Sequence, residues 1–171
     1  MQFTKTRIVK SPTRANTNDA GIDFYIPELT INDISLIRSN YNIDYDITKD
    51  YGLIQSIDIL PHGRILIPSG IHVRLEQNTA LIFMNKSGVA SKTGLIIGAC
   101  VVDESYTGEV HLSLINTSEN IITIKPNQKI AQGVIFNMNY SQPTEIDNIQ
   151  DLYKDMNSKR GSGGFGSTDE K

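Results

Sequence analysis

Short apolar runs, many of them alternating with polar residues, repeat along most of the chain. His111–Asn116 and Ile121–Ile124 place apolar side chains at alternate positions, as a strand with one buried face does. Turn-forming residues interrupt the runs at Pro61–Gly63, Pro68–Gly70 and Lys125–Asn127. The pattern predicts short strands over Phe3–Val9, Ile22–Ile26, Ile54–Leu60, Arg64–Ile67, Ile71–Leu75, Ala80–Met84, Gly94–Ile97, Cys100–Asp103, Glu109–Asn116, Ile121–Ile124 and Lys129–Phe136.

Many short strands at this spacing indicate an all-β fold: an antiparallel sandwich, a jelly roll or a barrel. A parallel α/β fold is disfavoured, because no long amphipathic helices alternate with the strands. Two regions break the pattern. The polar stretch from Glu28 to about Asp50 is interpreted as an insertion, with a short helical turn around Asp33–Arg38. Glu145–Met156 is either a frayed helix or an extended connector.

Length and charge narrow the class of protein. At 171 residues the chain suits one domain with a sizeable core. Its 16 Lys and Arg against 19 Asp and Glu give a net charge of -3, which argues against binding of duplex nucleic acid but not of a small anion. The single cysteine, Cys100, indicates a reducing compartment without internal disulfides. Because no apolar run approaches about 18 residues and residues 1–10 lack a signal-peptide core, we expect a cytoplasmic protein with no membrane contact.

Residues 160–171 form a glycine-rich C-terminal tail. Glycine loses the most conformational freedom on ordering, so we expect this tail to be mobile until a ligand orders it. The planar guanidinium group of Arg160 can bind a phosphate through two hydrogen bonds. The glycine N–H groups and the hydroxyls of Ser167 and Thr168 can bind an anion, and Phe165 can stack on a base. The tail is therefore predicted to be a lid over a nucleoside phosphate; the alternative is a disordered Gly/Ser terminus.

A second candidate is the segment Gly98–Glu109, which we interpret as a β-hairpin with Asp103 where its first strand ends. Free backbone groups on such a segment can form hydrogen bonds with the edge of a flat base. The ring of Tyr106 can pack against a sugar, and Asp103 can orient a water molecule as a general base. The alternative is a surface hairpin in which Asp103 only forms the turn.

Three further segments carry weaker signals. Lys86, Ser87 and Gly88 follow an apolar strand and could cradle an anion, or could belong to a polar loop with a short helical turn. Asp23 lies in a strand after Gly21 and could serve a metal or only a polar network. Gln132 would need a partner if buried, but an exposed edge position also explains it. The three histidines have no metal-ligand spacing, and one cysteine gives no zinc site.

Taken in order, these segments closely resemble the five ordered motifs of the trimeric dUTP diphosphatases (dUTPases). The resemblance extends from Ala20 to Thr168, and its third and fifth motifs are the specific ones. The corresponding segments are Ala20–Asp23, Lys86–Ala90, Gly98–Glu109, Lys129–Gln132 and Arg160–Thr168.

The resemblance implies a jelly-roll-like distorted β-barrel over residues 1–158, with an insertion at about 28–50, and a mobile lid over residues 159–171. It also implies a threefold homotrimer whose active sites are each shared by three chains. The implied reaction converts dUTP and water to dUMP and pyrophosphate with Mg²⁺ on the triphosphate, which keeps uracil out of DNA and supplies dUMP for thymidylate synthesis.

The resemblance also implies roles for individual residues. Asp103 contacts the deoxyribose and activates the attacking water, Tyr106 excludes a 2′-OH, and Asp23 acts through water near the metal. The backbone from Ala99 to Gly108 reads uracil. The residues assigned to the substrate are Lys86, Ser87, Gly88, Ala99, Cys100, Val101, Tyr106, Gly108, Gln132, Arg160, Phe165, Gly166, Ser167 and Thr168.

The chain departs from the family pattern in three places. Lys86 stands where most members carry Arg, so a bidentate fork becomes a point charge. Cys100 stands where Gly is common. The insertion at about 28–50 is either decoration or a docking surface for a protein partner. Two alternative functions follow: a dCTP deaminase-like enzyme of the same fold, whose chemistry needs a glutamate and an arginine-rich second motif, and a regulatory protein that binds a partner through the insertion.

Overall fold

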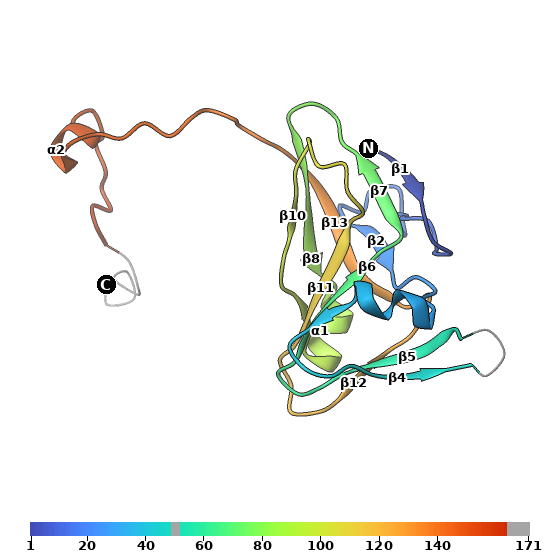
Figure 1. Ribbon diagram of the computed structural model, residues 1–171. Helices are drawn as coiled ribbons and strands as arrows, with labels where there is room; N and C mark the ends of the chain where they lie inside the picture. The colour runs from blue at the N-terminus through green and yellow to red at the C-terminus, as the bar shows by residue number, and fades with distance from the viewer. Residues whose placement is uncertain (49–51, 164–171) are drawn as a thin grey trace. The chain divides into compact units, whose positions relative to one another are not determined.

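The computed structural model describes residues 1–48 and 52–163 of the chain. The chain divides into two units, Met1–Asn139 and Tyr140–Lys171. The described strands all lie in the first unit, where they form antiparallel sheets around one hydrophobic core (Figure 1). The predicted lid over residues 159–171 stays a prediction.

The first sheet carries several of the residues singled out in the sequence. Its register pairs Gln132 with Asp23 on one side and with Met84 on the other. Phe24 and Phe83 meet edge to face in the core, with ring centroids 4.8 Å apart. The strand order is β10 (Val101–Val102), β8 (Thr79–Asn85), β13 (Lys129–Asn137) and β2 (Ile22–Tyr25).

The second sheet shows the alternation that the sequence predicted. Along His111–Asn116 every second side chain is buried, including Leu112, Leu114 and Asn116. Asn116 is fully buried, and its Nδ2 donates to the carbonyls of Ile59, Leu60 and Asn120 at 3.0, 3.0 and 2.7 Å. The strand order is β3 (Arg38–Ser39), β6 (Arg64–Pro68), β11 (His111–Asn116) and β9 (Leu95–Ile97).

Two smaller sheets complete the unit. One contains β12 (Ile122–Ile124), β5 (Ile54–Ile59) and β4 (Asp44–Ile47), and the other pairs β1 (Gln2–Lys5) with β7 (Ile71–Arg74). The first strand is shorter than predicted, because the chain bends away after Thr6 donates to the Gly70 carbonyl.

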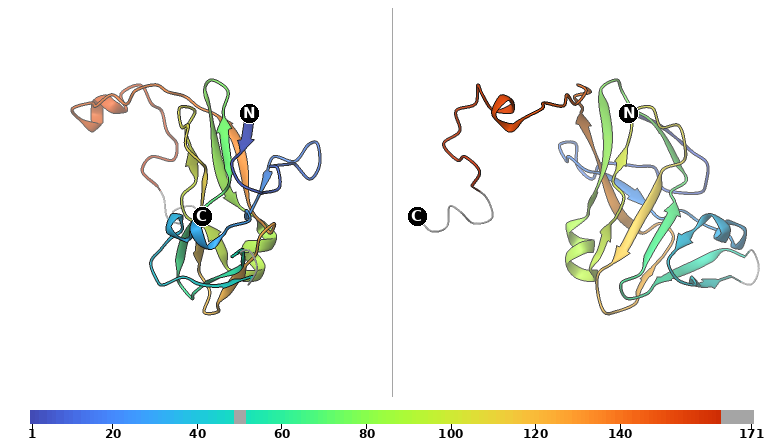
Figure 2. Two further views of the ribbon diagram at one scale, coloured as in Figure 1. Left: turned by 45° about the vertical axis from the view of Figure 1, so that its right-hand side comes forward. Right: turned by 60° about the vertical axis from the view of Figure 1, so that its left-hand side comes forward.

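The insertion is more regular than the sequence indicated. Its expected helical turn is present as the 3-10 helix η1 (Ile31–Leu36), but two strands, β3 and β4, were missed. Tyr45 and Ile47 alternate with Asp44 and Asp46 in β4, but the strand is short, lies in an Asn- and Asp-rich stretch, and has only Tyr45 half-buried; its backbone pairs with β5. β4 and β5 lie beside η1 in each view (Figures 1 and 2).

Two short α-helices lie outside the sheets. Helix α1 (Ser87–Thr93) follows β8 and ends at Gly94, whose φ of 76° is the left-handed conformation that glycine adopts readily. In the second unit, α2 (Ile149–Leu152) begins after Asn148, whose side chain accepts from the Asp151 N–H at 2.9 Å. It is a single turn within the predicted helix or connector at Glu145–Met156. Among the described residues, no helix has both the length and the apolar character needed to span a membrane.

Candidate active site

The segment from Gly98 to Glu109 is not a β-hairpin. Gly98 donates to Ser113 at 2.9 Å, and the chain then crosses to the other large sheet, where β10 pairs with β8. The prediction was wrong because the two arms of the segment find partners far away in the sequence, which local patterning does not reveal. As a consequence, β10 lies at the edge of its sheet, and its outer backbone groups face away from β8.

This segment forms one side of a cleft of about 190 Å³, which we call the β10 cleft. The Phe83 N–H donates to the Cys100 carbonyl at 2.7 Å, and the Tyr106 N–H donates to the Asp103 carbonyl at 3.1 Å. Asp103 is exposed at the cleft, where it can accept a hydrogen bond from water. The lining residues are Leu66, Phe83, Ala99, Cys100, Val101, Val102, Asp103, Tyr106, Val110 and His111.

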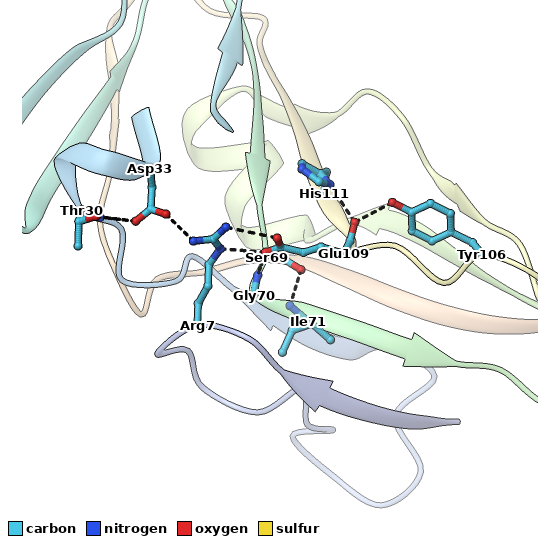
Figure 3. A network of polar contacts seen from close by, with 9 residues as sticks. All are labelled: Arg7, Thr30, Asp33, Ser69, Gly70, Ile71, Tyr106, Glu109 and His111. Carbon is cyan, nitrogen blue, oxygen red and sulfur yellow. Dashed lines mark hydrogen bonds and ion pairs between the residues drawn. The ribbon is translucent and has the colours of Figure 1, made fainter. Parts of the chain in front are cut away.

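The ring of Tyr106 is held at the β10 cleft from two sides. Its hydroxyl donates to the Glu109 carbonyl at 2.8 Å (Figure 3). Gly108 lies against the ring, and a Cβ at this position would stand 2.4 Å from the tyrosine oxygen. Gly108 does not line the cleft itself; its lack of a side chain makes room for Tyr106.

A second cleft, of about 320 Å³, lies around Asp23, and we call it the lysine cleft. The side chain of Asp23 is only 5% exposed, and Lys86 Nζ and Lys129 Nζ contact its two oxygens at 2.5 and 2.6 Å. Gln132 Nε2 donates to the Asn85 carbonyl at 2.9 Å. The lining residues are Ala15, Asp19, Ala20, Gly21, Asp23, Lys86, Lys129 and Gln132.

The charge of Asp23 is maintained by its two partners. Burial alone would raise the pKa of this carboxyl, but the hydrogen bonds and charges of Lys129 and Lys86 outweigh burial and hold the pKa below its ordinary value. The same contact raises the pKa of Lys129. Asp19 also lines the cleft, so its two carboxylates balance the charges of the two lysines, while the ammonium groups keep N–H donors that Asp23 does not use.

Lys129 also lines the lysine cleft, although the sequence did not single it out. In a regular strand, residues three apart point to opposite faces, so Lys129 and Gln132 would be separated. A bulge between Lys129 and Ala131 changes the register, and Ile130 and Ala131 are both buried in succession. Lys129 and Gln132 therefore share one face. The only sequence signal was the lysine that opens the fourth motif.

Other predicted residues lie outside the two clefts. Ser87 and Gly88 are exposed at the start of α1, and a Cβ at Gly88 would meet nothing within 4 Å. Arg160 belongs to the second unit, where its Nε donates to the Gly163 carbonyl at 2.7 Å. Phe165, Gly166, Ser167 and Thr168 lie outside the described residues. The structure thus brings together Ala99, Cys100, Val101, Asp103 and Tyr106, and separately Asp23, Lys86 and Gln132, with no lining residue common to both sets.

The described residues offer no protein-only metal cage. Within residues 1–48 and 52–163, no three His, Cys, Asp or Glu side chains are grouped to hold an ion. Asp23 keeps unused lone pairs, since a carboxylate has about four acceptor sites and the two lysines take two of them. This donor set fits an ion that retains water and is held largely by another ligand, as Mg²⁺ often is.

Fold and clefts together define an antiparallel jelly-roll-like β-barrel protein with small polar sites at its surface. Residues 37–169 match the family model of dUTPase, and the chain belongs to that family. It is 36% identical over 125 residues to the deoxyuridine 5′-triphosphate nucleotidohydrolase of Gloeothece citriformis, covering 72% of this chain and 82% of the relative.

Solved structures have the same fold. The dUTPase of Staphylococcus bacteriophage 80alpha, a mutant solved with dUpNHpp, is similar with a TM-score of 0.68 and 17% identity over 98% of both chains. A mutant dUTPase of phage phi11 of S. aureus, described with a structural Mg(II) ion, is similar with a TM-score of 0.61 and 16% identity over 88% of this chain and 99% of that one. The predicted family and jelly-roll-like barrel are confirmed.

Proposed function

We propose that the chain is a dUTP diphosphatase that converts dUTP and water to dUMP and pyrophosphate. The observation that carries this proposal is the β10 cleft, in which an edge-strand backbone, the exposed Asp103 and the ring of Tyr106 surround one space in a member of the dUTPase family. The reaction removes dUTP from the DNA precursors and supplies dUMP for thymidylate synthesis. We expect it to act on the nucleotide pool of the cytoplasm.

Asp103 acts as the general base in this proposal. Its carboxylate takes a proton from a water molecule, the water oxygen bonds to the α-phosphorus, and the bond to the bridging oxygen breaks so that pyrophosphate leaves. The backbone of Ala99, Cys100 and Val101 reads uracil, and Tyr106, seated over Gly108, excludes a 2′-OH. The close packing of Gly108 under the ring supports a fixed ring position.

The lysine cleft is proposed to bind the phosphates. An ammonium group has three donors, and Lys86 and Lys129 each use one of them on Asp23, so donors remain for phosphate oxygens. Gln132 adds an amide, and the open space at Gly88 leaves room for a ligand beside Ser87. In the tail, the residues proposed to close over the base and γ-phosphate are Arg160, Phe165, Gly166, Ser167 and Thr168.

Mg²⁺ is the proposed cofactor, carried on the triphosphate. When bound with the substrate, Mg²⁺ would supply charge neutralisation for the phosphates. Asp23 would hold it indirectly, by accepting a hydrogen bond from one of its water ligands. The unused lone pairs of this buried carboxylate support that role.

A homotrimer would unite the separate parts of the site. The two clefts of one chain share no lining residue, although both are required for the reaction as proposed. We therefore propose that the β10 cleft of one subunit faces the lysine cleft of a second, and that the tail of a third closes over both. A chain that ends at Lys159 is expected to remain trimeric by analytical ultracentrifugation but to lose most activity; loss of the trimer would instead make the tail structural.

A substrate panel tests the function. The purified protein with Mg²⁺ is incubated with dUTP, dCTP, dTTP or UTP, and the products are separated by chromatography. Release of dUMP and pyrophosphate from dUTP alone is the expected result. Conversion of dCTP would favour the deaminase alternative, whereas no turnover would favour a regulatory protein.

A protein partner at the insertion is the second candidate role. Three large apolar side chains of the insertion, Ile31, Leu36 and Ile47, are 46%, 45% and 39% exposed. Such a partner is compatible with hydrolysis as well as with its loss. Co-purification with the full chain, compared with a variant in which Ile31 and Leu36 are replaced by serine, tests this role.

A further inference from the structure

Three segments far apart in the sequence meet at Arg7. Its Nη1 contacts Asp33 Oδ1 of helix η1 at 2.6 Å, and its Nε contacts Glu109 Oε1 at 3.0 Å (Figure 3). A longer contact of 3.4 Å joins Nη2 to Glu109 Oε2. We call Arg7, Asp33 and Glu109 the Arg7 cluster. It connects the N-terminal segment, the insertion and the chain that follows Tyr106.

The cluster is well enough buried to hold its geometry. The side chains of Arg7, Asp33 and Glu109 are 17%, 19% and 17% exposed. Burial tends to lower the pKa of Arg7, but its two carboxylate partners raise it overall. Burial tends to raise the pKa of Asp33, but hydrogen bonds from Thr30 and Arg7 lower it overall. The planar guanidinium fork fixes two acids in defined directions, which a lysine at the same place would not do.

Glu109 connects the Arg7 cluster to Tyr106 at the β10 cleft. Its carboxylate is held by Arg7 and by the Gly70 N–H, which donates at 2.6 Å. Its carbonyl accepts from the Tyr106 hydroxyl at 2.8 Å and faces His111 Nδ1 at 2.9 Å (Figure 3). The carbonyl that accepts from the Tyr106 hydroxyl and the carboxylate held by Arg7 thus belong to one residue, next to Val110, whose N–H donates to the Ile71 carbonyl at 2.8 Å.

The other end of the cluster is anchored in the insertion. Asp33 Oδ2 accepts from the Thr30 N–H and hydroxyl, each at 2.8 Å, which caps helix η1. Its second oxygen, Oδ1, faces Arg7. The guanidinium group of Arg7 thus joins helix η1 to Glu109.

We propose that Arg7 and Asp33 are positioning residues that set the ring of Tyr106 through Glu109, so that the insertion controls the sugar selectivity of the β10 cleft. The inference rests on the proposed function in one respect: Tyr106 must be the group that excludes a 2′-OH. Neither Arg7 nor Asp33 lines the cleft. A role limited to attaching the insertion would affect stability without affecting selectivity.

The test compares Arg7→Lys and Asp33→Asn with the wild type. The measured quantity is kcat/KM for dUTP divided by kcat/KM for UTP. Both variants are expected to lower this ratio roughly tenfold, because a loosened ring admits the ribose hydroxyl. Tyr41→Phe is the matched control, since it removes a hydrogen bond of 3.0 Å between the insertion and Asp58 without touching the cluster. Its ratio is expected to equal that of the wild type.

If either variant folds and its ratio of kcat/KM for dUTP to kcat/KM for UTP equals that of the wild type, the proposal is overturned. If Arg7→Lys does not fold, the result for Asp33→Asn decides the question. A second readout does not depend on turnover. In protein with labelled tyrosine, the ring signal of Tyr106, assigned with Tyr106→Phe, is expected to shift in both variants and not in the control. If the wild type hydrolyses no dUTP, the proposed function fails, and an unshifted Tyr106 signal would separately overturn the coupling.

Discussion

Replacing Asp103 by asparagine is the sharpest test of the proposed chemistry. The change keeps the size of the side chain but removes its capacity to take a proton. Asp103 is exposed, and the contact that anchors this segment is made by its backbone carbonyl, which accepts from the Tyr106 N–H at 3.1 Å. The local structure and the stability are therefore expected to stay unchanged.

A positioned general base contributes about 10²–10⁴-fold to a rate, which corresponds to roughly 3–5 kcal/mol of barrier. We expect kcat for dUTP to fall by that factor in Asp103→Asn, while binding of the non-hydrolysable analogue dUpNHpp, measured by calorimetry, changes by less than about threefold. Glu104→Gln is the matched control, because it removes the neighbouring carboxylate and should keep near-normal turnover. Near-normal turnover in Asp103→Asn would refute the general-base role, and equal losses in both variants would mean that net charge matters rather than position.

Other parts of the structure give further expectations. Lys129→Met should lower kcat/KM for dUTP about tenfold in steady-state assays, because the lysine cleft loses one cation while Asp23 keeps Lys86. An unaltered value would exclude Lys129 from the site. Asn116→Ala should lower the free energy of unfolding in urea by about 2–4 kcal/mol, since buried carbonyls lose their donor; a loss below about 1 kcal/mol would contradict this. The folded-state pKa of Asp33 is lowered, so its stabilisation is present above the unfolded pKa and lost as pH falls through the folded value. The stability difference between wild type and Asp33→Asn should therefore shrink on acidification below about pH 4, measured by urea unfolding across pH.

Most strands could be predicted from the sequence because their apolar alternation reflects burial on one face. His111–Asn116 is such a strand, and its buried positions follow the pattern. β4 was not found in this way, although Tyr45 and Ile47 alternate with Asp44 and Asp46, because the run is short, is surrounded by Asn and Asp residues, and lies at the edge of its sheet. The polar residues that suggested an irregular insertion belong in part to β4, which lies at the edge of its sheet.

The candidate site was predicted in its residue types but not in its assembly. Asp103 and Tyr106 do share a cleft, yet the segment that carries them joins two sheets instead of forming a hairpin. Lys129 reaches Asp23 only because a bulge turns its side chain, and a bulge leaves no periodic signal. The Arg7 cluster is also invisible to local patterning, because its members lie in segments that meet only after folding.

The separation of the two clefts has a genetic consequence. In the proposed trimer, a subunit with a damaged β10 cleft still offers an intact lysine cleft to its neighbour, and the reverse also holds. Two different inactive alleles, one in each cleft, could then complement each other in mixed trimers, whereas two alleles in the same cleft could not. A single defective allele would inactivate only the sites that contain its own damaged cleft, so the activity of mixed trimers would fall in proportion to the fraction of defective subunits and the effect would not be dominant.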